Sequence, residues 1–208
     1  MILIGQYDSP FVRRVGIALR LYDLVFEHKP WSTFADGERV AAYNPLRRVP
    51  ALVLEGGEVL IESIVILDYL DELIGPARAL VADAGPARRQ ALKICALATG
   101  TAEKAVSLFY EHVLHETASQ TWVERCRSQI GGALDVLEFD RARRTTPCWF
   151  GDSLGHADLA VACALRFINE AHPGLFDPGR WPALAAHATQ CEAMSVFQDI
   201  AQPFIPPA

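Results

Sequence analysis

The chain has 208 residues, of which 51% are hydrophobic and 21% are charged. These fractions are typical of a folded globular protein and exclude a chain that is disordered throughout. The 19 Lys and Arg residues stand against 25 Asp and Glu residues, which gives a formal charge of −6. A protein that coats nucleic acid would carry a basic footprint, so we expect no nucleic-acid partner.

The apolar runs of the sequence are too short to span a membrane. None approaches the ~20 residues that a spanning helix needs, and the first residues lack the pattern of a secretory signal. The five cysteines form neither a Cys-x-x-Cys pair nor a zinc-ligand pattern. We therefore expect no membrane partner, no bound metal, and buried free thiols in a reducing cytoplasm.

Short strand patterns alternate with helix patterns over residues 1–76. Residues 2–4 (ILI) and 25–29 predict two strands, joined by a helix that begins at Pro10. A crossover of this length favours parallel pairing of the two strands. Residues 38–42 predict a further short helix.

The helix that begins at Pro10 is predicted to be amphipathic. Its apolar residues recur at steps of three and four positions, while Arg13, Arg14 and Arg20 fall on its other faces. We therefore expect these three arginines to lie off the buried face.

Two apolar runs separated by Glu-Gly-Gly predict a β-hairpin over residues 51–61. A helix from about Ser63 to Ile74 follows and ends at Gly75-Pro76. The order β-α-β-α-β-β-α over so few residues indicates a compact α/β layer structure.

The rest of the chain predicts helices alone. Residues 77–85 are rich in Ala, Gly and Pro and are the expected linker to an all-α domain at residues 86–208. Helical periodicity covers residues 87–110, 121–139, 157–171 and 182–193.

Two helix starts in the first domain could bind charged groups of a small ligand. Ser9 stands before the first helix, and Glu62 and Ser63 stand at the start of the last. Ser is a common N-cap, so a purely structural role stays open for both serines. As a binding site, the first helix start would stabilise an anion such as a thiolate, while Glu62 would accept an ammonium and Ser63 a carboxylate.

The loop before the hairpin is a third candidate segment. Val49-Pro50 suits a tight turn, in which Pro50 could be cis and the backbone of Val49 could pair with a peptide-like ligand. Arg47 and Arg48 could hold carboxylates, or they could be solvated charges. Together the three segments describe a site for a small zwitterionic peptide that carries an extra anion.

Two patterns in the helical region suggest other chemistry. Residues 151–155 fit the Gly-x-Ser-x-Gly pattern of serine hydrolases, but no sheet is predicted around Ser153. His112 and His115 lie at helical spacing, but two histidines without a third ligand make a poor metal site. We therefore expect neither a hydrolase site nor a metal site there.

Residues 9–19 (SPFVRRVGIAL), 44–52 (NPLRRVPAL) and 61–70 (IESIVILDYL) resemble three motifs of the serine-type cytosolic glutathione transferases, nearest to the tau and omega groups and their bacterial relatives. The length and the two-part layout fit as well. The resemblance implies a thioredoxin-like domain that binds glutathione and a helical-bundle domain that shapes the pocket for a small electrophile. It also implies a cytoplasmic homodimer with a role in detoxification.

The resemblance assigns roles to individual residues. Ser9 would be the catalytic residue, with a hydroxyl that hydrogen-bonds the glutathione sulfur. The residues expected to bind glutathione are Phe11, Arg48, Val49, Pro50, Glu62 and Ser63. For the electrophile pocket the candidates are Phe109, Tyr110 and Phe204, although core packing is an open alternative for each.

Two departures from the family pattern are visible. Arg47-Arg48 stands where many relatives have Gly-Lys, which leaves open which arginine contacts glutathione. Gly155 stands three residues before Asp158, where Ser or Thr usually caps the helix.

The position of the first cysteine separates two kinds of chemistry. A cysteine at position 9 could form a mixed disulfide with glutathione, but Ser9 cannot. No cysteine precedes Cys95, so no other thiol is expected in the first domain. We therefore predict conjugation of glutathione, or glutathione-dependent reduction of a peroxide. The alternative is a module of the same fold that binds ligands or partner proteins without catalysis.

Overall fold

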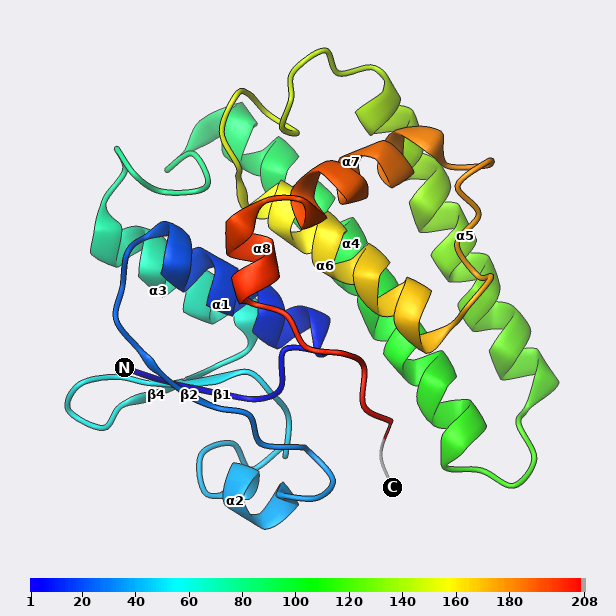
Figure 1. Ribbon diagram of the computed structural model, residues 1–208, viewed down its shortest axis with the longest axis horizontal. Helices are drawn as coiled ribbons and strands as arrows, with labels where there is room; N and C mark the ends of the chain where they lie inside the picture. The colour runs from blue at the N-terminus through cyan, green and yellow to red at the C-terminus, as the bar shows by residue number, and fades with distance from the viewer. Residues whose placement is uncertain (207–208) are drawn as a thin grey trace. The chain divides into compact units, whose positions relative to one another are not determined.

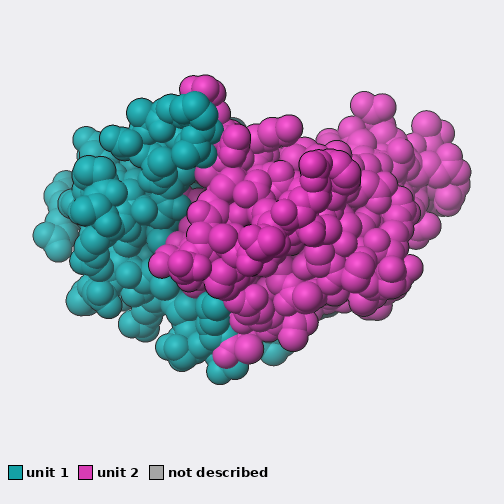
Figure 2. Space-filling model, turned by 90° about the horizontal axis from the view of Figure 1, so that it is seen from above, with its two compact units in different colours: residues 1–88, 194–208 teal, residues 89–193 magenta. Residues whose placement is uncertain are grey.

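A computed structural model describes residues 1–206 of the chain. The chain divides into two compact units, which Figure 2 colours separately. The first unit combines residues 1–88 with the chain from Met194 onward, and the second unit spans residues 89–193.

A four-stranded mixed sheet forms the centre of the first unit. Its strands are β1 (Ile2–Ile4), β2 (Glu27–Lys29), β3 (Ala51–Val53) and β4 (Val59–Ile61), in the spatial order β2-β1-β3-β4. β1 pairs in parallel with β2, and β3 pairs antiparallel with both β1 and β4. The predicted crossover and hairpin are thus confirmed, but β2 is shorter than predicted and Val25, at 90% exposure, lies outside it.

Helices cover both sides of this sheet (Figure 1). α1 (Pro10–Leu21) and α3 (Ser63–Ile74) pack against each other on one side, and the short α2 (Gly37–Ala41) lies on the other. A further short helix, α8 (Ser195–Asp199), packs against α1. The sequence did not predict α8, because five residues are too few to show helical periodicity.

Two arginines of α1 are buried, which corrects the prediction that they lie off the buried face. Arg13 and Arg14 are 1% and 3% exposed. Arg13 donates hydrogen bonds to the carbonyl oxygens of Phe197 and Ile200, each at 2.8 Å. Arg14 donates from Nε to Ser63 Oγ at 3.1 Å. These partners offset the large cost of removing a guanidinium group from water.

The contacts of Arg13 also explain where the chain divides. The sequence predicts one helical domain over residues 86–208. In the structure, the second unit ends at Ala193 and the chain from Met194 onward belongs to the first unit. The carbonyl groups that Arg13 binds belong to α8 and to the residue after it. A buried cation of the first unit therefore holds the C-terminal segment there.

The second unit is helical. Its helices are α4 (Gly85–Val113, from Arg89 onward), α5 (Gln120–Ala142), α6 (His156–Ala171) and α7 (Pro182–Glu192). α7 packs against both α5 and α6, and 12 of the 16 residues of α6 are buried. The four predicted helices are confirmed, and α4 and α5 extend beyond their predicted ends.

Several sequence predictions about chemistry can be compared with this fold. All five cysteines are free and buried, as predicted. No helix among the described residues combines the length and the apolar character that a bilayer crossing needs. Within residues 1–206, no three His, Cys, Asp or Glu side chains gather closely enough to hold a metal ion.

A buried polar cluster fixes the start of α6. Asp158 is 1% exposed and accepts hydrogen bonds from the backbone N–H groups of Trp149 (2.7 Å) and Gly155 (2.8 Å). Its carboxylate thus supplies the N3 half of a capping box. The N-cap residue Gly155 has no side chain to supply the other hydrogen bond, as predicted. His187 of α7 lies with Nε2 3.5 Å from Asp158 Oδ1 and 3.6 Å from Cys191 Sγ.

The burial of His187 makes the stability of the second unit depend on pH. Burial, and secondly the nearby Arg141 guanidinium, lower the pKa of His187 from 6.5 to about 4. As the pH falls from 6.5 to 4, the unfolded chain therefore gains a proton at this residue that the folded chain does not. The stability that depends on neutral His187 is complete above pH 6.5 and is lost toward pH 4, and the loss amounts to about 3 kcal/mol.

We expect the substitution His187→Gln to flatten the decline of the free energy of unfolding over this pH range. The measurement is urea denaturation at a series of pH values, compared with the wild type. The same substitution at the exposed His115 is the control and should keep the wild-type decline. Burial raises the pKa of the neighbouring Asp158, which acts in the opposite direction, so the two buried groups partly offset each other in the wild type. An unchanged decline in His187→Gln would contradict the prediction.

Candidate functional site

Ser9 begins α1 at the end of the loop that follows β1. Its backbone is extended (φ −69°, ψ 123°), and its side-chain oxygen lies 3.5 Å from the backbone nitrogen of Val12, from which it accepts a hydrogen bond. Since this bond uses a lone pair, the hydroxyl proton can be donated to another acceptor. Pro10 occupies the first helical position as predicted, and Phe11, in the same turn, is partly exposed. The partial positive charge of the helix start favours an anion beside Ser9.

Gly5 allows the start of α1 and the loop before β3 to approach each other. A Cβ atom on Gly5 would lie 2.5 Å from Val12 Cγ2 and 2.8 Å from Val49 Cβ, both closer than real side chains come. Gly5 also has a φ of +126°, which L side chains rarely adopt. The first turn of α1 and Val49 therefore meet at the same end of the sheet.

The loop before β3 is shaped by a buried asparagine. Asn44 is 1% exposed, and its side chain accepts from the N–H of Leu46 (3.0 Å) and donates to the carbonyl of Arg48 (2.9 Å). The peptide bond between Val49 and Pro50 is cis, an alternative that the sequence left open. Sequence reasoning gave Asn44 no role, although Asn is a residue that commonly folds its side chain onto the backbone two positions ahead.

Glu62 and Ser63 lie together at the start of α3. Glu62 has a positive φ of 66° with a ψ of 122°, a sparsely populated conformation for a residue with a side chain. Ser63 is 4% exposed, and its Oγ accepts the hydrogen bond from Arg14 described above. The lone pair of Ser63 is thus engaged by a cation, which leaves its hydroxyl proton for an acceptor at the helix start.

The two arginines of the loop point to different partners. Arg48 Nη1 lies 3.6 Å from Glu62 Oε1, and both side chains are about half exposed. Arg47 instead forms an exposed ion pair with Glu38 at 2.6 Å. Of the two arginines that the sequence could not tell apart, Arg48 is therefore the one beside the start of α3.

The residues predicted for the electrophile pocket are divided between the units. Phe109 and Tyr110 lie on α4 in the second unit, with ring centroids 6.0 Å apart. Phe204 lies in the C-terminal segment of the first unit. Neither unit alone contains the three residues, so their shared role stays a prediction.

The rival motif around Ser153 lies in a different setting from a hydrolase site. Residues 151–155 form a loop before α6 in the helical unit. Within residues 89–193, all of which the structure describes, β-type pairing is limited to the isolated bridge between Cys148 and Gly151. A nucleophile elbow needs a parallel sheet around it, so this loop is a helix start.

The fold and the site together define a two-unit protein that presents three polar segments at one end of a thioredoxin-like sheet. Family models for the N-terminal and the C-terminal domain of glutathione S-transferases match residues 3–78 and 120–189. The uncharacterized GST-like protein YibF of Escherichia coli strain K12 is 34% identical over 174 residues, which cover 81% of this chain and 82% of that protein. The chain therefore belongs to the glutathione S-transferase family.

Solved structures of the family have the same fold. A glutathione S-transferase of Methylobacterium radiotolerans in complex with glutathione sulfonate is 28% identical, with a TM-score of 0.89 over 100% of this chain and 98% of that one. One from Methylobacillus flagellatus with glutathione bound is also 28% identical, with a TM-score of 0.88 over 98% and 99% of the two chains. They confirm the predicted fold class, a thioredoxin-like domain followed by a helical bundle.

The substitution Asn44→Ala should destabilise the first unit. It leaves the N–H of Leu46 and the carbonyl of Arg48 without their partner, which costs about 1–3 kcal/mol where these groups cannot reach water. Urea denaturation measures the loss. The exposed Asn169 of α6 provides the control, because its replacement by Ala should change the free energy of unfolding little. Equal stability of the two variants would show that Asn44 does not hold the loop.

Proposed function

We propose that this chain is a serine-type glutathione transferase, in which Ser9 stabilises the thiolate of bound glutathione for attack on a small electrophile. The observation that carries the proposal is the place of Ser9, at the N-cap of α1 with a hydroxyl that can donate toward an anion. The relatives solved with glutathione or glutathione sulfonate support glutathione as the co-substrate.

The proposed role of Ser9 requires a moderate free energy of thiolate stabilisation. A free thiol has a pKa of about 8.5, so only a few per cent is ionised at neutral pH. Lowering that pKa by about two corresponds to roughly 2.7 kcal/mol of preferential binding of the thiolate. One hydrogen bond to a charged group contributes about 1.5–3 kcal/mol, and a helix start adds about 0.3–1 kcal/mol. Ser9 therefore acts as a hydrogen-bond donor and needs no base to activate it.

The other two segments would hold the peptide part of glutathione. The backbone of Val49 would pair with the cysteinyl residue as a neighbouring strand would, with Pro50 and Phe11 beside it. The Ser63 hydroxyl and the start of α3 would bind the γ-glutamyl carboxylate. Glu62, whose carboxylate lies beside Arg48, would accept the ammonium group of the same residue.

The bound thiolate would then attack an electrophilic carbon, forming a carbon–sulfur bond as the leaving group departs with its electron pair. Reduction of an organic hydroperoxide would use the same thiolate. Phe109, Tyr110 and Phe204 remain the candidates for the electrophile pocket. The free thiols of the chain fit a reducing cytoplasm.

We further propose that the chain forms a homodimer, as the family resemblance implies. α3 exposes apolar side chains at Ile64 (57%) and Val65 (50%), which favours a partner surface over this helix. Light scattering should give twice the mass of one chain. Val65→Glu should shift the chain toward the monomer, while the control Val25→Glu, at a residue outside the helices, should remain dimeric. A monomeric wild type would refute the proposal.

The substitution Ser9→Ala tests the proposed catalytic role. It removes the donor, so the pKa of bound glutathione should rise toward its free value and the rate of conjugation at neutral pH should fall about ten- to hundredfold. The affinity for glutathione should stay nearly unchanged, because the contacts of Val49, Glu62 and Ser63 remain. The measurements are calorimetric titration with glutathione and the thiolate absorbance as a function of pH.

Ser9→Thr is the matched control, since it keeps a hydroxyl and is also an accepted N-cap. It should retain most of the lowered thiol pKa. Wild type that binds glutathione with an unshifted thiol pKa would instead favour the alternative, a binding module without catalysis. Failure of the wild type to bind glutathione would defeat the assignment of the site.

A further inference from the structure

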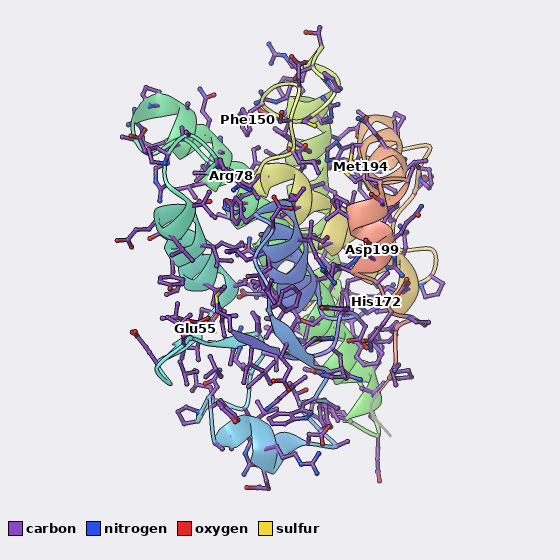
Figure 3. The ribbon with its side chains drawn as sticks, turned by 60° about the vertical axis from the view of Figure 1, so that its left-hand side comes forward. Glu55, Arg78, Phe150, His172, Met194 and Asp199 are labelled. Atoms are coloured by element: carbon purple, nitrogen blue, oxygen red, sulfur yellow. The ribbon has the colours of Figure 1, made fainter. Side chains whose placement is uncertain are left out.

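The C-terminal tail of the first unit is tied to the loop that carries Ser9. The tail leaves α8, whose flanking residue Met194 and last residue Asp199 are labelled in Figure 3. Gln202 Oε1 accepts a hydrogen bond from the backbone N–H of Tyr7 at 3.0 Å. The N–H of Ile205 donates to Asp8 Oδ2 at 3.1 Å. The tail thus binds the two residues that immediately precede Ser9.

The base of the tail is anchored more deeply than its end. The carbonyls of Phe197 and Ile200 accept the two hydrogen bonds of the buried Arg13, whose guanidinium also lies 5.5 Å from the centre of the Phe197 ring. Phe197 and Ile200 are themselves 0% and 1% exposed. The path of the chain toward Gln202 is therefore fixed before it reaches the loop.

The opposite side of the loop is held by residues close to it in the fold. The ring of His28 on β2 stacks on Tyr7 with centroids 3.8 Å apart and donates from Nε2 to the carbonyl of Gly5 at 2.8 Å. The N–H of Ser9 donates to the carbonyl of Gln6 at 3.2 Å. Residues 5–9 lie outside helices and strands. They are held by these bonds, by the N–H of Gly5, which donates to the carbonyl of Lys29 at 2.9 Å, and by the tail.

We propose that the tail is a positioning element for Ser9, with Gln202 acting through Tyr7 and Ile205 acting through Asp8. This inference rests on the proposed function, in which Ser9 donates to the glutathione thiolate. Neither tail residue touches the reacting sulfur in this scheme. Their role is to keep the loop from shifting, so that the hydroxyl of Ser9 stays directed at the sulfur.

The geometry of hydrogen bonds explains why such support affects the chemistry. A hydrogen bond weakens steeply as its angle departs from linearity, and misplacement of a reacting group by about 1 Å can cost about a hundredfold in rate. The contacts that would bind the rest of glutathione come from Val49, Glu62 and Ser63. Ser63 is held by Arg14 and Glu62 lies beside Arg48, and neither arginine belongs to the tail. Loss of the tail contact should therefore raise the thiol pKa and lower kcat, with little change in the KM for glutathione.

Two variants test this role. Gln202→Met removes the acceptor of the Tyr7 N–H while it keeps the length of the side chain. A chain that ends at Ala201 removes both ties and retains the carbonyls that Arg13 binds. The matched control is Gln198→Met, the same substitution at an exposed residue of α8.

The readouts are the thiolate absorbance of bound glutathione against pH, and kcat and KM with chlorodinitrobenzene as the electrophile. At a pH below the thiol pKa, both variants should show about three- to tenfold less thiolate and a matching loss of kcat. The KM for glutathione should stay within about twofold. Gln198→Met should behave as the wild type.

The outcomes separate this inference from the proposed function. If the wild type binds glutathione without lowering its thiol pKa, the proposed role of Ser9 fails, and the role of the tail fails with it. If the wild type lowers the thiol pKa and both variants lower it equally, the positioning role of the tail is wrong, while the proposed role of Ser9 stands. A raised KM with an unchanged thiol pKa would also overturn the role of the tail. Should the shortened chain fail to fold by circular dichroism, Gln202→Met decides the question.

Discussion

The first unit depends on two adjacent buried guanidinium groups. Arg13 and Arg14 follow each other on α1, so their side chains leave the helix in different directions. Each needs partners for its N–H groups, because a buried cation without them is strongly destabilising. Arg13 finds them in the tail and Arg14 in Ser63 at the start of α3. One turn of helix thereby fixes two segments that are far apart in the sequence.

The candidate site follows from this arrangement. Ser9 begins the same helix that carries the two arginines, and Ser63 is held by one of them. Gly5 then brings Val49 against the first turn of α1 by omitting a side chain. The three polar segments are thus assembled by contacts that are themselves structural. A site made this way is preorganised, since its groups are held in place before any ligand arrives.

Sequence patterns predicted the parts of this structure that depend on neighbouring residues. Strands, long helices and the Ser9 cap are local, and each was recognisable from its own periodicity or residue types. The burial of Arg13 was predicted wrongly because its partners lie 184 and 187 residues away. The hydrogen bond between Gln202 and Tyr7 joins residues 195 positions apart and could not be predicted for the same reason. Motif resemblance singled out Glu62 and Ser63, but the different ion-pair partners of Arg47 and Arg48 could be seen only in the structure.

The tail also shows how stability differs along one segment. Its base, at Phe197 and Ile200, is buried and bound to a cation, so releasing it would expose apolar surface and leave Arg13 without acceptors. Its end is held by hydrogen bonds of partly or fully exposed groups. Such bonds contribute little net free energy, because water can replace either partner. The base of the tail is therefore held more strongly than its end, so a chain that ends at Ala201 should keep the fold of the first unit.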